Sequence, residues 1–492
     1  MFYRTVRVCA IGIVMIAATL HVNAQETTSS PADLSESAQE TTPQSPNSTQ
    51  QSSQETNPQS STDAQEKDTQ GKKEEERSTG LPKNVNWKFN FDAGWGTFGF
   101  ANSLYTDVRP DFSGNLSDNW FEGYIKPALS GSFGLGKGEL YGKVSAVGER
   151  TYGAPPSIVG ESASSFKQED LYAGWRSGTS LGNTENLLDI TVGRAPYTIG
   201  HGFLVWDGAG EGGSRGGFWT NARKAWQFAT VVRFQPKHHK LEGFYLDRDD
   251  LPENDTGTRL AGINYEYAPT ETSTFGATYF HTLAHASVLP DRDGMNVLDF
   301  RAYTAPLPAF PDLSFEAEYA HEKNGNLMES DAWTLLGAYQ LSKIRWKPKF
   351  SYRYAFFDGN DPSTPKNEAF DPLFPGFYDW GTWWQGEIAG EYFLANSNNI
   401  SHQLRVHFTP SESLGWGVMG YWFNLPHPST FGPGATSSNV AFEFDSYADW
   451  KINKNFTLSL VGAIADPRKA AQEAFNRKSN FYYGMVYIAY SF

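Results

Sequence analysis

The sequence predicts a transmembrane antiparallel up-and-down β-barrel of about 18 strands, preceded by a signal peptide and a disordered N-terminal leader. Three observations predict it: a short apolar segment at the N-terminus, runs alternating between apolar and polar residues from Trp87 onward, and a C-terminal strand with aromatic residues at both ends. Of 492 residues, 15% are aromatic and 47 are glycine, and the mean hydropathy is -0.50. This composition is too polar for a helical membrane protein but fits strands that face lipid on one side and water on the other.

The N-terminal segment, residues 1–24, has the layout of a secretory signal peptide. Arg4 and Arg7 precede an apolar run, and the small residue Ala24 ends a cleavage site. A retained membrane helix is the alternative, but the run is shorter than the ~20 residues needed to span hydrocarbon. The single cysteine, Cys9, lies within this segment, so the mature chain has no thiolate or disulfide, and no cofactor is expected.

The leader, residues 25–86, consists mainly of Ser, Thr, Gln, Glu, Pro and Asn. Such a segment cannot bury enough apolar surface to offset its chain entropy, so we expect disorder. It is either a periplasmic tether or a polar leader without a specific role.

Residues 87–492 alternate with the period of two that marks β-strands. Clear examples run from Trp226 to Phe234, from Trp346 to Phe356 and from Val440 to Trp450, each with one mostly apolar face. Counting such runs gives roughly 18 to 20 candidates, and because bacterial barrels close with an even number we predict 18. The run 201–207 is either a strand or a loop.

The C-terminal strand is the most diagnostic element. Its even positions from Tyr482 to Phe492 place aliphatic residues in the middle and aromatic residues at the ends. Ten residues, tilted, rise about 26 Å, close to the apolar band of an outer-membrane barrel with its two aromatic girdles. We therefore expect the outer membrane as the location, with lipid, lipopolysaccharide and the barrel-assembly machinery as partners, and Phe492 as part of the assembly signal.

A barrel of this size leaves an aqueous channel, so the polar face of each strand is expected to line a lumen. The formal net charge of -15 says little about that lumen, because outer loops are often acidic. Three successive runs carry the candidate lumen residues. These are Arg345, Lys347, Lys349 and Arg353 in the first, Gln385, Glu387 and Glu391 in the second, and Gln403, Arg405 and His407 in the third. If the runs are neighbouring strands, cations flank an acidic strand, either as a salt-bridge network in the wall or as fixed charges for an anionic solute.

Two regions resemble the bacterial alginate export porin family. Residues 370–377, 380–387 and 391–393 are similar to its C-terminal half, and Val192-Gly193-Arg194 with residues 200–203 is similar to its mid-barrel motif. The resemblance implies a monomeric 18-stranded barrel with a basic constriction that passes a polyuronate. It also implies that Arg194, Arg353, Glu387 and Arg405 lie in the lumen. Strict alternation points Arg194 at lipid, so a bulge or strand end at Gly193 is required.

The expected function is thus a channel for an anionic polysaccharide or oligosaccharide, and the alternative is a general or small-solute porin. A barrel lipid hydrolase would need a Ser/His pair, and no spacing selects one; a structural or adhesive barrel is a further alternative. No nucleic-acid module is present. The acidic segment 247–255 is either a solvated loop or a calcium site.

Overall fold

The computed structural model describes residues 85–105, 114–156, 162–305, 309–376, 385–432 and 434–492. The expected signal peptide and the leader up to residue 84 lie outside these residues. So do residues 377–384, which carry part of the alginate-export resemblance.

Eighteen strands make up nearly all of the regular structure, which confirms the predicted number and fold class. The first nine are β1 (Val85–Ala101), β2 (Asp118–Leu135), β3 (Gly138–Tyr152), β4 (Ser164–Arg176), β5 (Leu188–Arg194), β6 (Phe228–Phe234), β7 (His239–Asp247), β8 (Arg259–Thr270) and β9 (Ser273–Leu283). The second nine are β10 (Asn296–Thr304), β11 (Leu313–Asn324), β12 (Met328–Gln340), β13 (Lys349–Phe357), β14 (Asn399–Ser411), β15 (Leu414–Asn424), β16 (Asn439–Lys451), β17 (Phe456–Pro467) and β18 (Phe481–Ser491).

The helical elements among the described residues are short. They are η2 (Pro252–Asn254), the π-helix η3 (Gly386–Phe393), η4 (Pro428–Thr430) and α2 (Lys469–Phe475). No helix among the described residues is long and apolar enough to cross a membrane.

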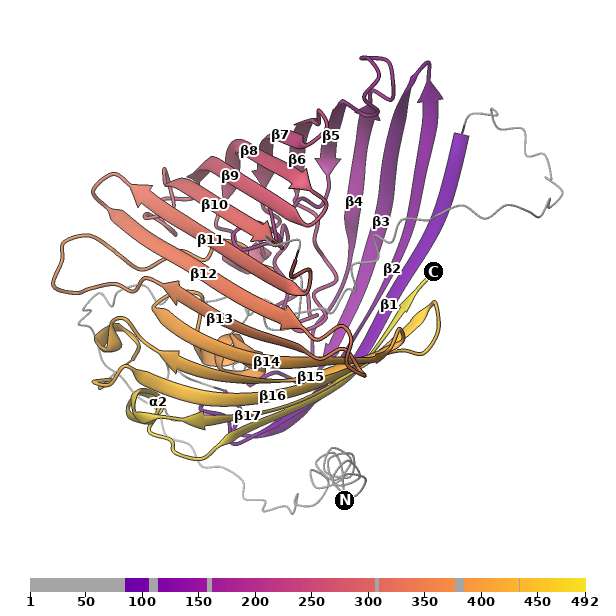
Figure 1. Ribbon diagram of the computed structural model, residues 1–492. Helices are drawn as coiled ribbons and strands as arrows, with labels where there is room; N and C mark the ends of the chain where they lie inside the picture. Colours follow the sequence, from indigo (N-terminus) through magenta and orange to yellow (C-terminus); the bar gives the residue numbers. More distant parts are fainter. Residues whose placement is uncertain (1–84, 106–113, 157–161, 306–308, 377–384, 433) are drawn as a thin grey trace, which may run out of the picture. The chain divides into compact units, whose positions relative to one another are not determined.

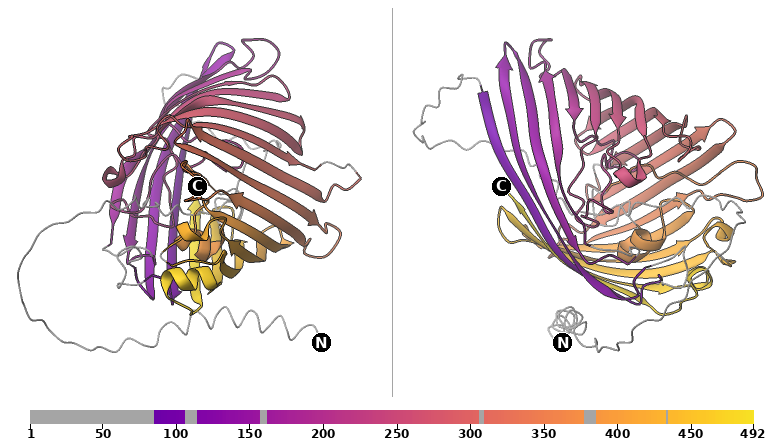
Figure 2. Two further views of the ribbon diagram at one scale, coloured as in Figure 1. Left: turned by 90° about the vertical axis from the view of Figure 1, so that its left-hand side faces the viewer. Right: turned by 180° about the vertical axis from the view of Figure 1, so that it is seen from behind.

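The sheet closes on itself because β1 pairs with both β2 and β18 (Figures 1 and 2). All neighbouring strands run antiparallel and in chain order, as an up-and-down barrel requires. At the seam, the backbone N–H and C=O of Phe91 exchange hydrogen bonds of 3.1 and 3.0 Å with those of Phe492. Closure leaves no strand edge unpaired in the hydrocarbon, which is the condition for a sheet to span a membrane.

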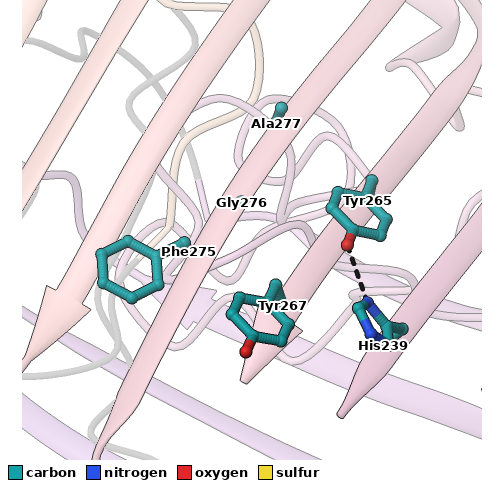
Figure 3. Close-up of a pocket in the computed structure, with 6 residues that line it drawn as sticks. All are labelled: His239, Tyr265, Tyr267, Phe275, Gly276 and Ala277. Atoms are coloured by element: carbon teal, nitrogen blue, oxygen red, sulfur yellow. Dashed lines mark hydrogen bonds between the residues drawn. The ribbon is translucent and has the colours of Figure 1, made fainter. Parts of the chain in front are cut away.

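The outer face of the barrel is apolar and rich in aromatic residues. On β18 the even positions point outward and the odd positions, such as Tyr483 and Tyr487, are buried in the interior, which confirms the predicted phase. Outward side chains at other strands include Trp95 on β1 and the cluster of Tyr265, Tyr267 and Phe275 in Figure 3. A closed barrel with such an exterior is an outer-membrane protein that crosses the bilayer with its strands.

The two ends of the barrel differ in their connections. Turns of two residues join β2 to β3, β8 to β9 and β14 to β15, whereas 33 residues join β5 to β6 and 41 join β13 to β14. Outer-membrane barrels have short periplasmic turns and longer extracellular loops. The short-turn end, where β1 begins and β18 ends, is therefore the periplasmic end.

The structure corrects two details of the strand prediction and decides a third, the run 201–207, which was either a strand or a loop. Trp226 precedes β6, and residues 201–207 belong to a loop. Trp346 and Pro348 lie in the β12–β13 turn rather than on a strand, and Trp346 has φ 69°, a left-handed turn conformation. The alternation between apolar and polar residues starts in this turn, before β13 begins, so a period of two does not indicate a strand here.

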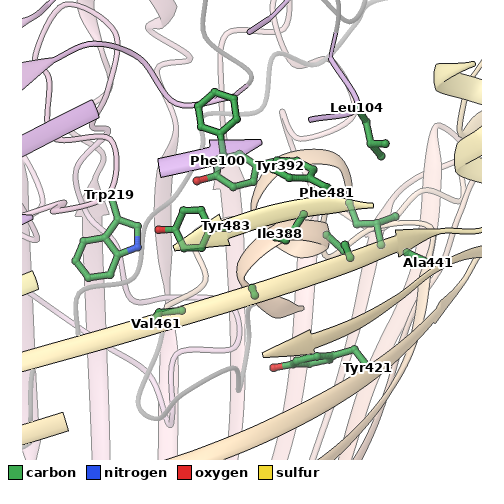
Figure 4. Packing of buried hydrophobic residues seen from close by; sticks show 14 of the residues in the cluster. Phe100, Leu104, Trp219, Ile388, Tyr392, Tyr421, Ala441, Val461, Phe481 and Tyr483 are labelled. Atoms are coloured by element: carbon green, nitrogen blue, oxygen red, sulfur yellow. The ribbon is translucent and has the colours of Figure 1, made fainter. Parts of the chain in front are cut away.

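The hydrophobic core lies inside the barrel, between the wall and loops folded into the lumen. The cluster shown in Figure 4 contains Tyr421, Val461 and Tyr483 of the wall together with Trp219 of the β5–β6 loop and Ile388 and Tyr392 of η3. A second cluster packs Phe203 and Val205 of the β5–β6 loop against Phe357 of β13 and Phe374. The 18-stranded wall therefore encloses packed loops where the strand number alone predicted open water.

Candidate functional site

The β5–β6 loop, residues 195–227, crosses the lumen from one wall to the other. At one end, Phe203 packs on Phe357 of β13, with ring centroids 5.7 Å apart. At the other, the Trp219 ring lies 5.1 Å from Phe98 of β1 and 4.9 Å from Tyr487 of β18. Because β13 lies eight strands from β5, nearly half-way round the closed sheet of 18, the loop crosses the lumen and narrows the passage.

Carboxylates on the inner wall hold the backbone of this loop. Glu122 of β2 accepts hydrogen bonds from the N–H groups of Trp219 and Thr220, at 2.8 and 3.0 Å. Glu169 of β4 accepts from Lys224 and Ala225, at 2.6 and 2.9 Å. An irregular segment inside a barrel cannot leave its N–H groups unpaired, and these two carboxyl groups supply the acceptors. These wall carboxylates thus fix the height at which the loop lies.

Three arginines converge on one carboxylate at the outer half of the lumen. Arg215 and Arg223 of the β5–β6 loop contact the Asp249 carboxylate at 3.1 and 2.7 Å, and Arg194 at the end of β5 contacts it as well. Burial alone would raise the pKa of Asp249, but the guanidinium groups of Arg194, Arg215 and Arg223 outweigh it and lower the pKa. The aspartate therefore stays ionised and ties three chain segments together; we call this group the Asp249 node.

A further acid adjoins the node. Glu211 lies 3.6 Å from Arg223, and burial together with the nearby charge of Glu149 raises its pKa well above the usual range. The node therefore sits beside a carboxyl group that carries a proton more readily than a free glutamate does. This keeps the interior from accumulating uncompensated negative charge.

The β13–β14 loop also folds into the lumen and carries η3. The N–H groups of Ile388 and Ala389 donate to the two Glu443 carboxylate oxygens on β16, at 2.8 and 2.7 Å. A carboxylate at a helix N-terminus satisfies donors that have no partner within the helix and complements the positive end of its dipole. Wall carboxylates thus hold both inward loops by the same device.

Below the loops, the inner wall carries a belt of alternating charges from β4 to β13. Arg176 contacts Asp189 at 3.2 Å, Arg233 contacts Glu242 at 2.7 Å, and Lys240 contacts Glu266 at 2.8 Å. Arg301 contacts Asp299 at 2.6 Å, and the Tyr303 hydroxyl donates to Glu318 at 2.6 Å. The charged belt consists of Arg176, Asp189, Arg233, Lys240, Glu242, Glu266, Asp299, Arg301, Glu318 and Arg353.

Five cations and five carboxylates therefore share the belt. Several face each other directly across strands, as Arg176, Asp189, Arg233 and Glu242 do on β4 to β7. Opposite charges in register stabilise a sheet and largely cancel each other's field at a distance. The belt thus gives solutes polar contacts without a strong net potential.

The predicted lumen residues are only partly brought together. Arg353 is buried on the inner face of β13 and Arg405 lies on β14, where its Nε donates to the Tyr447 hydroxyl at 2.8 Å. Lys349 is the first residue of β13. Arg345 and Lys347 are exposed in the β12–β13 turn, so their assignment to a lumen strand is wrong.

The expected acidic strand does not exist. Gln385, Glu387 and Glu391 lie at or within η3, and β13 pairs directly with β14. The π-helical turn is formed by a Gly-flanked sequence in which Gly386 has φ 87°, a conformation unfavourable for other residues. An added Cβ there would also meet Glu443 at 2.5 Å.

Arg194 turns inward because β5 ends beside it. Gly193 has φ 124°, and a Cβ at that position would lie 2.4 Å from the Leu171 carbonyl oxygen. This is the strand end that the alternation required at Gly193. Arg194 thereby reaches Asp249 instead of lipid.

Sequence reasoning missed the residues that hold the loops, namely Glu122, Glu169, Arg215 and Arg223. The available signal was weak: Glu122 and Glu169 are acids on alternating strands near their outer ends. The acidic segment 247–255 contains Asp249 and Asp250, whose carboxylates contact arginines, Asp250 pairing with Arg248 at 2.9 Å. No group of acids and histidines suited to a metal ion occurs among the described residues, so the calcium alternative gains no support.

Comparison with known proteins agrees with this architecture. No family model and no curated protein matches the sequence. Among solved structures, Pseudomonas aeruginosa OccK7 (OpdD) matches with a TM-score of 0.51 at 12% identity, covering 83% of this chain and 99% of that one. Pseudomonas aeruginosa OpdL matches with the same TM-score, identity and coverages. OccK8 (OprE) of that organism matches with a TM-score of 0.50 at 10% identity, covering 83% of this chain and 98% of that one.

The chain has the fold of outer-membrane porins. At these identities the likeness concerns the fold, and membership in the alginate export family stays a prediction. The comparison does, however, align nearly the whole of each porin with this barrel, so the 18-stranded architecture is shared from end to end.

Proposed function

We propose that this protein is a passive outer-membrane channel for small hydrophilic solutes, and that its two inward loops set the size limit. The observation that carries the proposal is the placement of the β5–β6 loop, which starts at β5, contacts β13 nearly opposite and also contacts β1 and β18. The likeness in fold to porins supports a channel over a hydrolase or an adhesive barrel.

The charges of the lumen favour small solutes over a polyanion. A channel for polyuronate needs cations that offset the polymer's lost hydration along its length. In this barrel the cations Arg176, Arg233 and Arg301 contact carboxylates, and Arg345 and Lys347 lie outside the lumen. A charged belt whose cations contact carboxylates instead suits neutral or dipolar solutes, because such solutes can replace their bound water by contacts with both cationic and anionic side chains.

The alginate-like function predicted from the resemblance remains the second candidate. Two residues favour this candidate. Arg353 on β13 and Arg405 on the neighbouring β14 both occupy inward-facing positions, as the family's basic constriction implies. The two functions differ in what binds. A polyuronate channel should be blocked by its substrate at low concentration, and a small-solute channel should not.

Proteoliposome swelling separates the two. Swelling in mono-, di-, tri- and tetrasaccharides should slow steeply with size, and a trimeric or longer polyuronate should neither enter nor compete. Rapid entry or competition by the polyuronate would favour the second candidate. Absence of swelling in any sugar, by protein shown to be folded, would contradict a channel function.

A further inference from the structure

The outer face of the barrel has a shallow groove at its periplasmic end, formed by β7, β8 and β9 (Figure 3). It measures about 460 Å³ and is lined by His239, Tyr265, Tyr267, Phe275, Gly276 and Ala277. We call this the β8 groove. It faces away from the lumen, because Tyr265, Tyr267 and Phe275 belong to the exposed row of their strands.

The groove exists because one small residue of the outward row, Ala277, sits among large ones. Ala277 pairs with Tyr265 and follows Phe275 on the outward row of β9. Gly276 is small for a reason on the other side of the wall, since a Cβ there would lie 2.6 Å from the Arg301 guanidinium of the charged belt. The groove is flanked by aromatic rings.

One end of the groove is polar. In Figure 3 the Tyr265 hydroxyl points at the ring of His239, and the oxygen and Nδ1 are 2.7 Å apart. His239 also stacks on Tyr267, with ring centroids 5.0 Å apart. Lys237 and His238, both exposed, precede His239 in the β6–β7 turn. Aromatic rings with polar tips lie at the level of lipid headgroups in barrel girdles.

The neighbouring turn supplies the opposite charge. Glu271, in the β8–β9 turn, is exposed at the same end of the barrel. A ligand held between these turns would therefore carry both an anionic and a cationic group. The apolar groove alone cannot select it, because surrounding lipid is as apolar as the groove.

We propose that the β8 groove binds a single phospholipid of the periplasm-facing leaflet that has a zwitterionic, amine-bearing headgroup. One acyl chain lies over Ala277 between Tyr267 and Phe275. The phosphate lies at Lys237 and His239, and the amine lies toward Glu271. This site lies outside the lumen and is independent of the solute that the channel passes.

The charge contribution can be tested without strain. Lys237 has φ 48°, and Asn tolerates this left-handed conformation, so Lys237→Asn removes the charge and keeps the turn. Lys343→Asn is the matched control, because Lys343 is exposed in the β12–β13 turn at the same end of the barrel. In nanodiscs of phosphatidylethanolamine and diacylglycerol with identical chains, native mass spectrometry measures which lipid the barrel retains.

Wild type should retain phosphatidylethanolamine in preference to diacylglycerol, and Lys237→Asn should reduce this preference about fivefold, the effect of one lysine near a lipid phosphate. Lys343→Asn should leave it unchanged. Equal effects of the two variants would overturn the proposal, since they would indicate general surface charge.

The acyl-chain position is tested by filling the groove. Ala277→Trp should reduce the number of retained lipids by one, and Ala261→Trp, on the outward row of β8 away from the groove, should not. Both variants place an aromatic residue at a lipid-facing position, so both should fold. Unchanged retention in Ala277→Trp would overturn the proposal, as would a wild-type dimer that this variant dissociates, because a second copy would then be the occupant.

Discussion

Replacing Asp249 by alanine should loosen the constriction. The substitution removes the shared partner of Arg194, Arg215 and Arg223 and leaves three guanidinium groups, one of them only 2% exposed, without that carboxylate. Breaking a buried ion pair from one side costs about 3–5 kcal/mol. A loss of that size lowers the ratio of docked to undocked β5–β6 loop by between roughly 100-fold and several thousand-fold.

The measurement is single-channel current in a planar bilayer. We expect Asp249→Ala to show larger or fluctuating conductance and faster protease cleavage within residues 195–227. Asp255→Ala is the control, because Asp255 is exposed in the same β7–β8 loop. Steady wild-type conductance and intact loops in a folded Asp249→Ala barrel would refute the account of how this loop is held.

Three further predictions concern other parts of the chain. Burial, and to a lesser extent the charges of Asp445 and Asp449, raises the pKa of Glu387 to about 8. The packing of η3 should therefore be most stable at low pH and should weaken as the pH rises from about 4.5 to about 8. Hydrogen exchange of η3, corrected for intrinsic rates, should show this dependence more steeply in wild type than in Glu387→Gln, where Glu391 of the same helix, whose pKa burial also raises, still contributes; equal slopes or the reverse trend would contradict it. Removing Phe492, which pairs with Phe91 at the seam, should sharply lower the outer-membrane yield, and an unchanged yield would count against its role in closure. Deleting residues 25–79 should leave a heat-modifiable, protease-resistant barrel, whereas loss of the barrel would show that the leader takes part in folding.

The wall of this barrel could be predicted from sequence because its pattern is local. Outward residues of β18 must be apolar and inward ones need not be, so alternation from Tyr482 to Phe492 reports the pleat directly. The same rule failed at Arg345 and Lys347, where the alternation continued into a turn. Periodicity records which residues alternate and contains no information on where pairing stops.

The interior could not be predicted because its contacts are distant in sequence. Arg194 and Asp249 are 55 residues apart, and Glu122 and Trp219 are 97 apart. Nothing in the run from Gln385 to Glu391 distinguishes a strand from a π-helix, and only the position of Glu443 on β16 explains its placement. A count of strands gives the size of the lumen but not what folds into it.

The most direct test of the proposed function is ion current through the purified protein in a planar bilayer with a salt gradient. The paired charges of the belt predict stepwise, passive conductance with a reversal potential near zero and no block by polyuronate. A strongly anion-selective reversal potential with block at low polyuronate concentration would contradict the small-solute channel, and a folded barrel that never conducts would contradict any channel.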